Sequence, residues 1–173
     1  RMYYKSWHID LGGNVSNPVV ICYAESKDGV YWEKPALGLV EFDGSKQNNI
    51  ILEKVHEHGC HDFSPFIDAR PGVSPDQRYK AIGYVRGLKE HHGLFGFVSA
   101  DAIHWKLIQD DFIIKEEGWV FDTQNIAFWS EAEQQYVMYY RRTVDEVRNI
   151  ARAVSKDFMN WKKEGFRFSR LLW

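Results

Sequence analysis

Short runs of apolar and aromatic residues, separated by polar turns, recur along the whole chain. Three of these runs, PVVICYAE, LFGFV and NIARAV, lead into a polar segment that ends in tryptophan. Runs of this length, rich in β-branched and aromatic residues and bounded by turn residues, are typical of β-strands. The pattern therefore predicts an all-β chain in which each of these strands enters a tight polar turn.

The polar segment is the same seven-residue word in all three places, S-x-D-x-x-x-W, at residues 26–32, 99–105 and 155–161. Its hydroxyl and carboxylate can accept N–H bonds from its own backbone, so we interpret the word as structural and not catalytic. Trp32, Trp105 and Trp161 share one register after the turn, and we expect them in equivalent buried positions. Intervals of 73 and 56 residues between the serines suit a four-stranded sheet with its loops, the unit of a β-propeller.

Each unit is predicted to hold four antiparallel strands, a to d in chain order, with the S-x-D-x-x-x-W turn after strand c. Strand a begins at Asp62 in the second unit and at Asp122 in the third, 37 and 33 residues before the serine of the same unit. In the first unit the corresponding position falls before residue 1. We therefore predict one partial β-propeller domain over residues 1–173, with blades at 1–55, 56–115 and 116–173, of which the first is incomplete.

Composition and charge narrow the function classes. Lysine plus arginine number 22 against 24 aspartate plus glutamate, and the chain lacks the basic stripe that a phosphate backbone requires, so we predict no nucleic-acid partner. No apolar run approaches the ~20 residues of a membrane helix and no signal peptide is visible, so we predict no membrane partner and leave localisation open. Cys22 and Cys60 are predicted to be two buried thiols.

The runs HDFSPFIDARPGVSPDQRYKA, FDTQNIAFW, YVMYYR and ARAVSKDFMNW resemble the five-bladed propeller glycoside hydrolases, the superfamily of families 43 and 32. The resemblance covers essentially the whole chain and implies an axial pocket that binds or cleaves a glycan. In those hydrolases three carboxylates enter the pocket from successive a strands: an Asp that acts as base or nucleophile, an Asp that orients and tunes, and a Glu that is the general acid.

Carried over by position, the resemblance makes Asp62 the orienting carboxylate and places Asp122 where the acid Glu stands, while the first Asp falls before residue 1. Two carboxyls beside the scissile bond suit glycoside hydrolysis, because one protonates the leaving oxygen and the other activates water or attacks the sugar. Asp62 and Asp122 are thus the catalytic candidates. We predict no cofactor. The substrate-binding candidates are His58, His61, Gln124, Arg142 and Trp119.

Two other groups of residues leave alternatives open. The word H-x-H-x-C-H at residues 56–61 has soft ligands, but it lacks the paired spacing of a structural zinc site, so we favour pocket-lining histidines over a metal. Arg141 and Arg142 alternate along a strand, so one of them faces the axis. A guanidinium beside Asp122 disfavours a general-acid role and favours a carboxylated or sulfated sugar; the alternative is a rim arginine paired with Asp145 or Glu146.

Two hypotheses for function remain. The first is a glycosidase with Asp62 and Asp122 in its pocket, and the second is a non-catalytic carbohydrate-binding or assembly module. A protein-interaction propeller is disfavoured because a near-constant period and a Trp-Asp signature are absent. Trp7 and Trp129 are predicted to pack between blades and not to stack on sugars. Open sheet edges and apolar faces predict a homodimer or higher closed oligomer, in which residues 166–168 and 171–173 cover the first blade of a partner copy.

Overall fold

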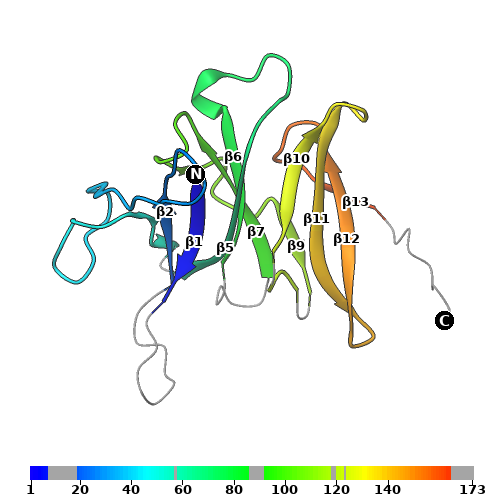
Figure 1. The fold of residues 1–173 in the computed structure, drawn as a ribbon. Coiled ribbons are helices and arrows are strands. Elements are labelled where there is room, and N and C mark those ends of the chain that lie inside the picture. The colour runs from blue at the N-terminus through cyan, green and yellow to red at the C-terminus, as the bar shows by residue number, and fades with distance from the viewer. Residues whose placement is uncertain (8–18, 57, 86–91, 118–119, 123, 165–173) are drawn as a thin grey trace.

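The computed structural model describes residues 1–7, 19–56, 58–85, 92–117, 120–122 and 124–164, and its fold is all-β (Figure 1). Apart from one turn of 3-10 helix at Pro75–Gln77, these residues form no helix. The described part of the chain accordingly holds no helix long and apolar enough to cross a membrane. The all-β prediction is confirmed.

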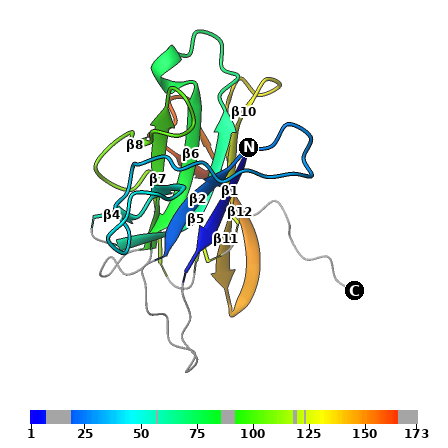
Figure 2. The ribbon, with the colours of Figure 1, turned by 60° about the vertical axis from the view of Figure 1, so that its left-hand side comes forward.

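The strands form three antiparallel sheets that lie side by side in chain order (Figures 1 and 2). The first sheet holds three strands, so the predicted incomplete first blade is confirmed for the described residues. The first sheet comprises β1 (Met2–Ser6), β2 (Val20–Ala24) and β3 (Ile50–Leu52). The second comprises β4 (Lys54–Val55), β5 (His58–Ile67), β6 (Tyr79–Val85), β7 (His92–Ser99), β8 (Lys106–Leu107) and β9 (Ile114–Glu116). The third comprises β10 (Ile126–Ser130), β11 (Gln135–Val144), β12 (Val147–Ser155) and β13 (Lys162–Glu164).

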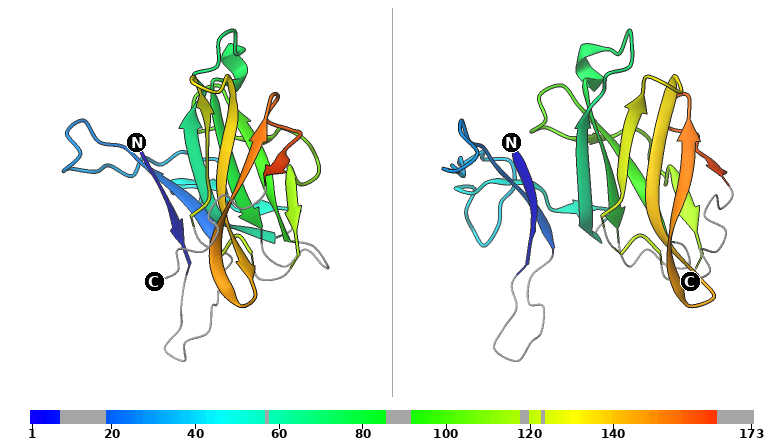
Figure 3. Two further views of the ribbon diagram at one scale, coloured as in Figure 1. Left: turned by 90° about the vertical axis from the view of Figure 1, so that its right-hand side faces the viewer. Right: turned by 45° about the vertical axis from the view of Figure 1, so that its right-hand side comes forward.

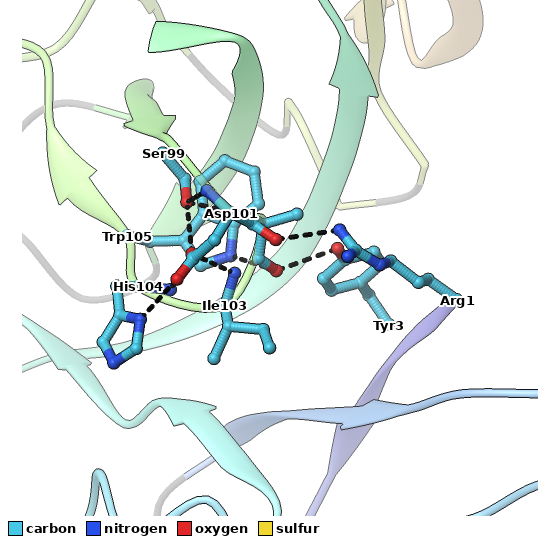
Figure 4. Close-up of polar contacts among 8 residues, drawn as sticks. Arg1, Tyr3, Ser99, Asp101, Ile103, His104 and Trp105 are labelled. Carbon is cyan, nitrogen blue, oxygen red and sulfur yellow. Dashed lines mark hydrogen bonds and ion pairs between the residues drawn. The ribbon is translucent and has the colours of Figure 1, made fainter. Parts of the chain in front are cut away.

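The repeated S-x-D-x-x-x-W word folds into the same hydrogen-bonded turn three times. In the second copy, drawn in Figure 4, Ser99 Oγ accepts the backbone N–H groups of Asp101 and Ala102, and Asp101 Oδ1 accepts those of the next two residues. The indole N–H of Trp105 then closes the turn on the carbonyl of Ala102 at 3.2 Å. Equivalent bonds recur at residues 26–32 and 155–161. The structural role predicted for the word is confirmed.

The three tryptophans differ in burial. Trp105 packs edge-on against Phe63 and Tyr3, and so bridges the first two sheets. Trp161 packs against the apolar cluster between the second and third sheets. Trp105 and Trp161 are half-buried, whereas Trp32 is 39% exposed, so the expectation of three equivalent buried positions is wrong. The reason is positional: the other two tryptophans join clusters formed with the sheet before their own, and among the described residues no sheet precedes the first.

The core lies between neighbouring sheets. Ile21, Tyr23 and Ile51 of the first sheet pack with Cys60 of the second. A larger cluster joins the second and third sheets; its members include Ile82, Leu94, Tyr136, Met138 and Phe158. Lys80 Nζ and Asp68 form an ion pair of 2.6 Å buried in this second interface, and the Tyr136 hydroxyl donates to the same carboxylate at 2.6 Å. Cys22 and Cys60 are both buried free thiols, as predicted.

Strand β7 contains a glycine that its neighbours require. A Cβ at Gly93 would lie 2.3 Å from Cδ1 of Phe112 and 2.8 Å from the carbonyl oxygen of Ile114. We expect Gly93→Ala to lower the free energy of unfolding by about 1–3 kcal/mol, the usual cost of overpacking. Gly72→Asn is the comparison variant, because a Cβ added there would meet no atom within 4 Å; its φ of 74° strains asparagine less than most side chains, so this variant measures backbone strain without overpacking. Urea unfolding of both variants measures the difference, and equal stabilities would contradict it.

Candidate functional site

A cavity of about 290 Å³ lies between the innermost strand of the first sheet, β1, and strand β5 of the second. Its volume is at the lower end of the range for ligand pockets. Aromatic, charged and amide side chains share its wall, which suits a polar ligand with apolar faces. The lining residues are Tyr3, Tyr4, Lys5, Ile21, His61, Asp62, Phe63, Ser64 and Gln124.

Asp62 is the carboxylate in the cavity wall. It follows a β-bulge in strand β5, where the pairing with β6 shifts between Cys60 and Asp62. Its side chain is 21% exposed and lies 3.7 Å from Lys5 Nζ. Burial raises the pKa of Asp62; Lys5 opposes the rise, and the negative charge of Asp122 adds to it. The two predicted catalytic carboxyls are therefore close enough to interact electrostatically.

Asp122 reaches this region from an irregular segment just before strand β10. The backbone N–H of Phe121 donates to the carbonyl of Arg141, while Asn125 Oδ1 accepts the backbone N–H of the same arginine. Asp122 lies in the chain between Phe121 and Asn125, the two residues that make these bonds, and before the first paired residue of β10. It is 61% exposed and lies 3.8 Å from Arg141 Nη2. The arginine that the sequence analysis placed beside Asp122 is present, and it balances the charge of this carboxylate.

The strand register does not extend to Asp122. Ser64 and Ile126 pair with equivalent positions of strands β6 and β11, and Gln124 comes two residues before Ile126, as Asp62 does before Ser64. The pairing of β10 begins at Ile126, so the expectation that Asp62 and Asp122 hold the same place in their units stays a prediction. Gln124 lines the cavity together with Asp62.

The other predicted binding residues divide into three groups. His61 and Gln124 line the cavity, as expected of substrate-binding candidates. His58 pairs with Val55 at the start of β5 and is not part of the cavity wall. Arg142 is on the opposite face of β11 from Arg141, and the arginine beside Asp122 is Arg141; a contact of Arg142 with substrate stays a prediction. Trp119 lies outside the described residues.

The histidine-rich word does not assemble a metal site in the described part of the chain. No group of three or more His, Cys, Asp or Glu side chains is placed there to hold an ion. His56 instead lies 3.4 Å from Asp110 and packs against the ring of Phe95, while Cys60 is fully buried. Burial also raises the pKa of the Cys60 thiol, which keeps it protonated at neutral pH.

Sequence reasoning missed Lys5, the basic partner of Asp62, although a signal for it exists. Tyr3, Tyr4 and Lys5 of β1 hold the same places in their sheet as Tyr139, Tyr140 and Arg141 of β11. The triplets YYK and YYR are thus repeated positions, and each ends in the residue that pairs with an aspartate.

Trp7 was predicted to pack between sheets, but it is exposed. The ammonium of Lys5 lies 4.7 Å from the centre of its ring. Trp129 does pack, against Tyr136.

No protein-family model and no curated protein matches this chain. Solved structures do resemble it. A fructofuranosidase variant from Schwanniomyces occidentalis, complexed with fructosylnystose, matches with a TM-score of 0.61 at 17% identity over 86% of this chain. An N-acetylgalactosamine deacetylase from F. plautii, in complex with blood group B trisaccharide, matches with a TM-score of 0.55 at 13% identity over 93% of this chain. The chain spans 27% and 47% of the length of these two proteins. The likeness shows the fold of a partial β-propeller.

Proposed function

We propose that the chain carries a glycan site of the glycoside hydrolase type in the cavity beside Asp62. The observation that carries the proposal is the pair of interacting carboxyls, Asp62 and Asp122, in unlike surroundings. Both structural neighbours are complexes with oligosaccharides, although their names describe two different reactions. The tyrosines of the wall and the exposed indole of Trp7 offer stacking surfaces for sugar rings.

The surroundings of the two acids favour a division of roles. Asp62 is largely buried and its pKa is raised, so it retains a proton to higher pH and suits the general acid that protonates a leaving oxygen. Asp122 is exposed beside Arg141 and suits the carboxylate that activates water or attacks the sugar. This division differs from the one that the resemblance implied, in which the position of Asp122 is that of the acid.

A second function, glycan binding without turnover, has its own support. Arg141 is 10% exposed, and its Nε has no hydrogen-bond partner among the described residues. A buried guanidinium with an unused donor suits a carboxylate or sulfate group on a sugar. This function requires no third carboxylate, and Asp62 is the only acid that the described residues contribute to the cavity wall.

The enzyme hypothesis predicts that Asp62→Asn and Asp122→Asn each lower turnover of a panel of aryl glycosides by at least about 100-fold, the contribution of acid–base catalysis. Because protonated Asp62 is the active form, wild-type activity should fall as pH rises through the raised pKa of that acid. The residual activity of Asp62→Asn should lack this fall. Initial rates between about pH 4 and pH 8 measure both effects.

Asp43→Asn is the matched control, because Asp43 has φ 51° in an exposed turn, a backbone that asparagine also adopts. It should leave rates and melting temperature unchanged. Binding of fructosylnystose and of blood group B trisaccharide, followed by ligand-observed NMR, separates the two functions. Binding that Asp62→Asn weakens, with no turnover of any glycoside, would favour the non-catalytic module; no binding and no turnover would contradict both.

A further inference from the structure

One contact between neighbouring sheets is formed twice within this chain. Between the first and second sheets, the Tyr3 hydroxyl donates to the carbonyl of Ala102 at 2.9 Å and Arg1 donates to the carbonyl of Asp101 at 2.8 Å (Figure 4). Ile103 and Trp105 of the same turn pack on the first sheet. The turn after strand c of one sheet therefore docks on the strands of the sheet before it.

The contact between the second and third sheets repeats this arrangement. Phe158 occupies the place of Ala102 in its turn, and it packs against Phe66 of the second sheet at 5.7 Å between ring centres. Ile82 and Leu94, which hold the places of Tyr3 and Ile21, lie in the same buried cluster. The surface on which a turn docks is thus formed by equivalent residue positions in the first and second sheets.

The third sheet presents the same receiving surface, and no other described sheet covers it. We call it the slot; its members are Ile126, Phe128, Tyr139 and Ile150. Tyr139 holds the place of Tyr3, and Ile150 that of Ile21. Ile150 is 66% exposed, whereas Ile21 and Leu94 are buried. A hollow of about 580 Å³ lies here, and Arg148 forms part of its wall.

The first sheet presents the complementary element. Its turn at residues 26–32 has the hydrogen bonds of the other two, but Val30, Tyr31 and Trp32 are exposed, Tyr31 by 79%. The apolar face behind this turn is covered by the chain itself, because Val40 and Phe42 pack on Val20, Cys22 and Ile50. The expectation of open apolar faces at both ends therefore holds only for the third sheet. At the first sheet, the exposed apolar element is the turn.

The structure assigns a second copy of this chain as the occupant: we propose that the turn at residues 26–32 of each copy docks in the slot of the other. The two elements lie at opposite ends of the row of sheets (Figure 3), so two copies can satisfy both at once around a two-fold axis. Six sheets in a ring is within the usual range of propellers.

Sedimentation velocity of the full chain tests the proposal. At about 50 μM, where even a micromolar affinity gives mostly complex, we expect a species of twice the 20.3 kDa chain mass. Tyr31→Lys at the turn and Ile150→Glu at the slot should each give monomers with an unchanged circular dichroism spectrum, since both side chains are exposed in the single chain. Val147→Glu is the matched control on β12, 60% exposed and outside the slot, and it should remain dimeric.

Mixing the two monomeric variants completes the test. The mixed pair has one wild-type contact and one in which the introduced charges are opposite, so the mixture should recover the dimer. A wild-type chain that stays monomeric at about 50 μM would overturn the proposal, since a stable interface of about 2,000 Å² holds at that concentration. Dimers that survive both substitutions, loss of the dimer in Val147→Glu, or a mixture that stays monomeric would equally overturn it.

Discussion

Lys80→Met should lower the free energy of unfolding by about 3–5 kcal/mol, the usual cost of removing one partner of a buried ion pair. Lys80 and Asp68 are both almost fully buried at the interface of the second and third sheets, 2.6 Å apart. Without the ammonium, the hydrogen bonds that the described residues still donate to the Asp68 carboxylate are neutral, from the Tyr136 hydroxyl and the backbone N–H of Arg70. Two neutral hydrogen bonds do not offset the desolvation of a full negative charge.

The double variant Lys80→Met, Asp68→Asn is the control for this prediction. Asparagine keeps an acceptor for Tyr136 but removes the charge, so the double variant should be more stable than Lys80→Met alone. Urea unfolding followed by tryptophan fluorescence gives all the free energies. A loss below about 1 kcal/mol in Lys80→Met, the range of an exposed pair, would show that the pair is not buried.

The repeating fold could be predicted because its signal is local. Each S-x-D-x-x-x-W word contains the donors and acceptors of its own turn, so Ser99 and Asp101 form the same bonds as their counterparts whatever surrounds them. The strands before the turns are short and apolar, and the number of residues between turns limits each unit to one sheet. Fold class and the incomplete first blade therefore followed from the sequence.

The candidate site could be predicted only in part, because it depends on register and on bulges. Asp62 was found from its place at the head of a paired segment, but Asp122 lies in the irregular segment before strand β10, where residue counting does not fix a position in the sheet. Which of Arg141 and Arg142 lies beside Asp122 could not be predicted for a related reason, since alternation says that neighbours face opposite sides without saying which side. Lys5 was missed because its partner Asp62 is in another sheet.

The exposure of Trp32 has the same origin. Burial of a residue after the turn depends on whether another sheet stands beside it, and local sequence carries no information on that. Three equivalent words therefore fold alike and pack differently, with Trp105 in contact with two aromatic rings and Trp32 open to solvent.

This difference predicts unequal costs for the same substitution. Trp105→Ala should lower the free energy of unfolding by about 3–5 kcal/mol, because it leaves a cavity against Phe63 and Tyr3 between two sheets. Trp32→Ala should cost less than about 1 kcal/mol in the single chain, as exposed substitutions usually do. Both indoles make the same hydrogen bond within their turns, so that bond cancels in the comparison.

The measurement is urea unfolding at submicromolar concentration in the Ile150→Glu background, where the contact between copies is absent and only the stability of the single chain is compared. Equal losses for Trp105→Ala and Trp32→Ala would mean that another part of the chain covers Trp32. In the wild-type background at high concentration, the loss for Trp32→Ala should grow, because this tryptophan belongs to the turn that docks in the slot of the second copy. A loss of unfolding free energy that depends on protein concentration for Trp32→Ala, and not for Trp105→Ala, would connect the repeat seen in the sequence to the assembly of the protein.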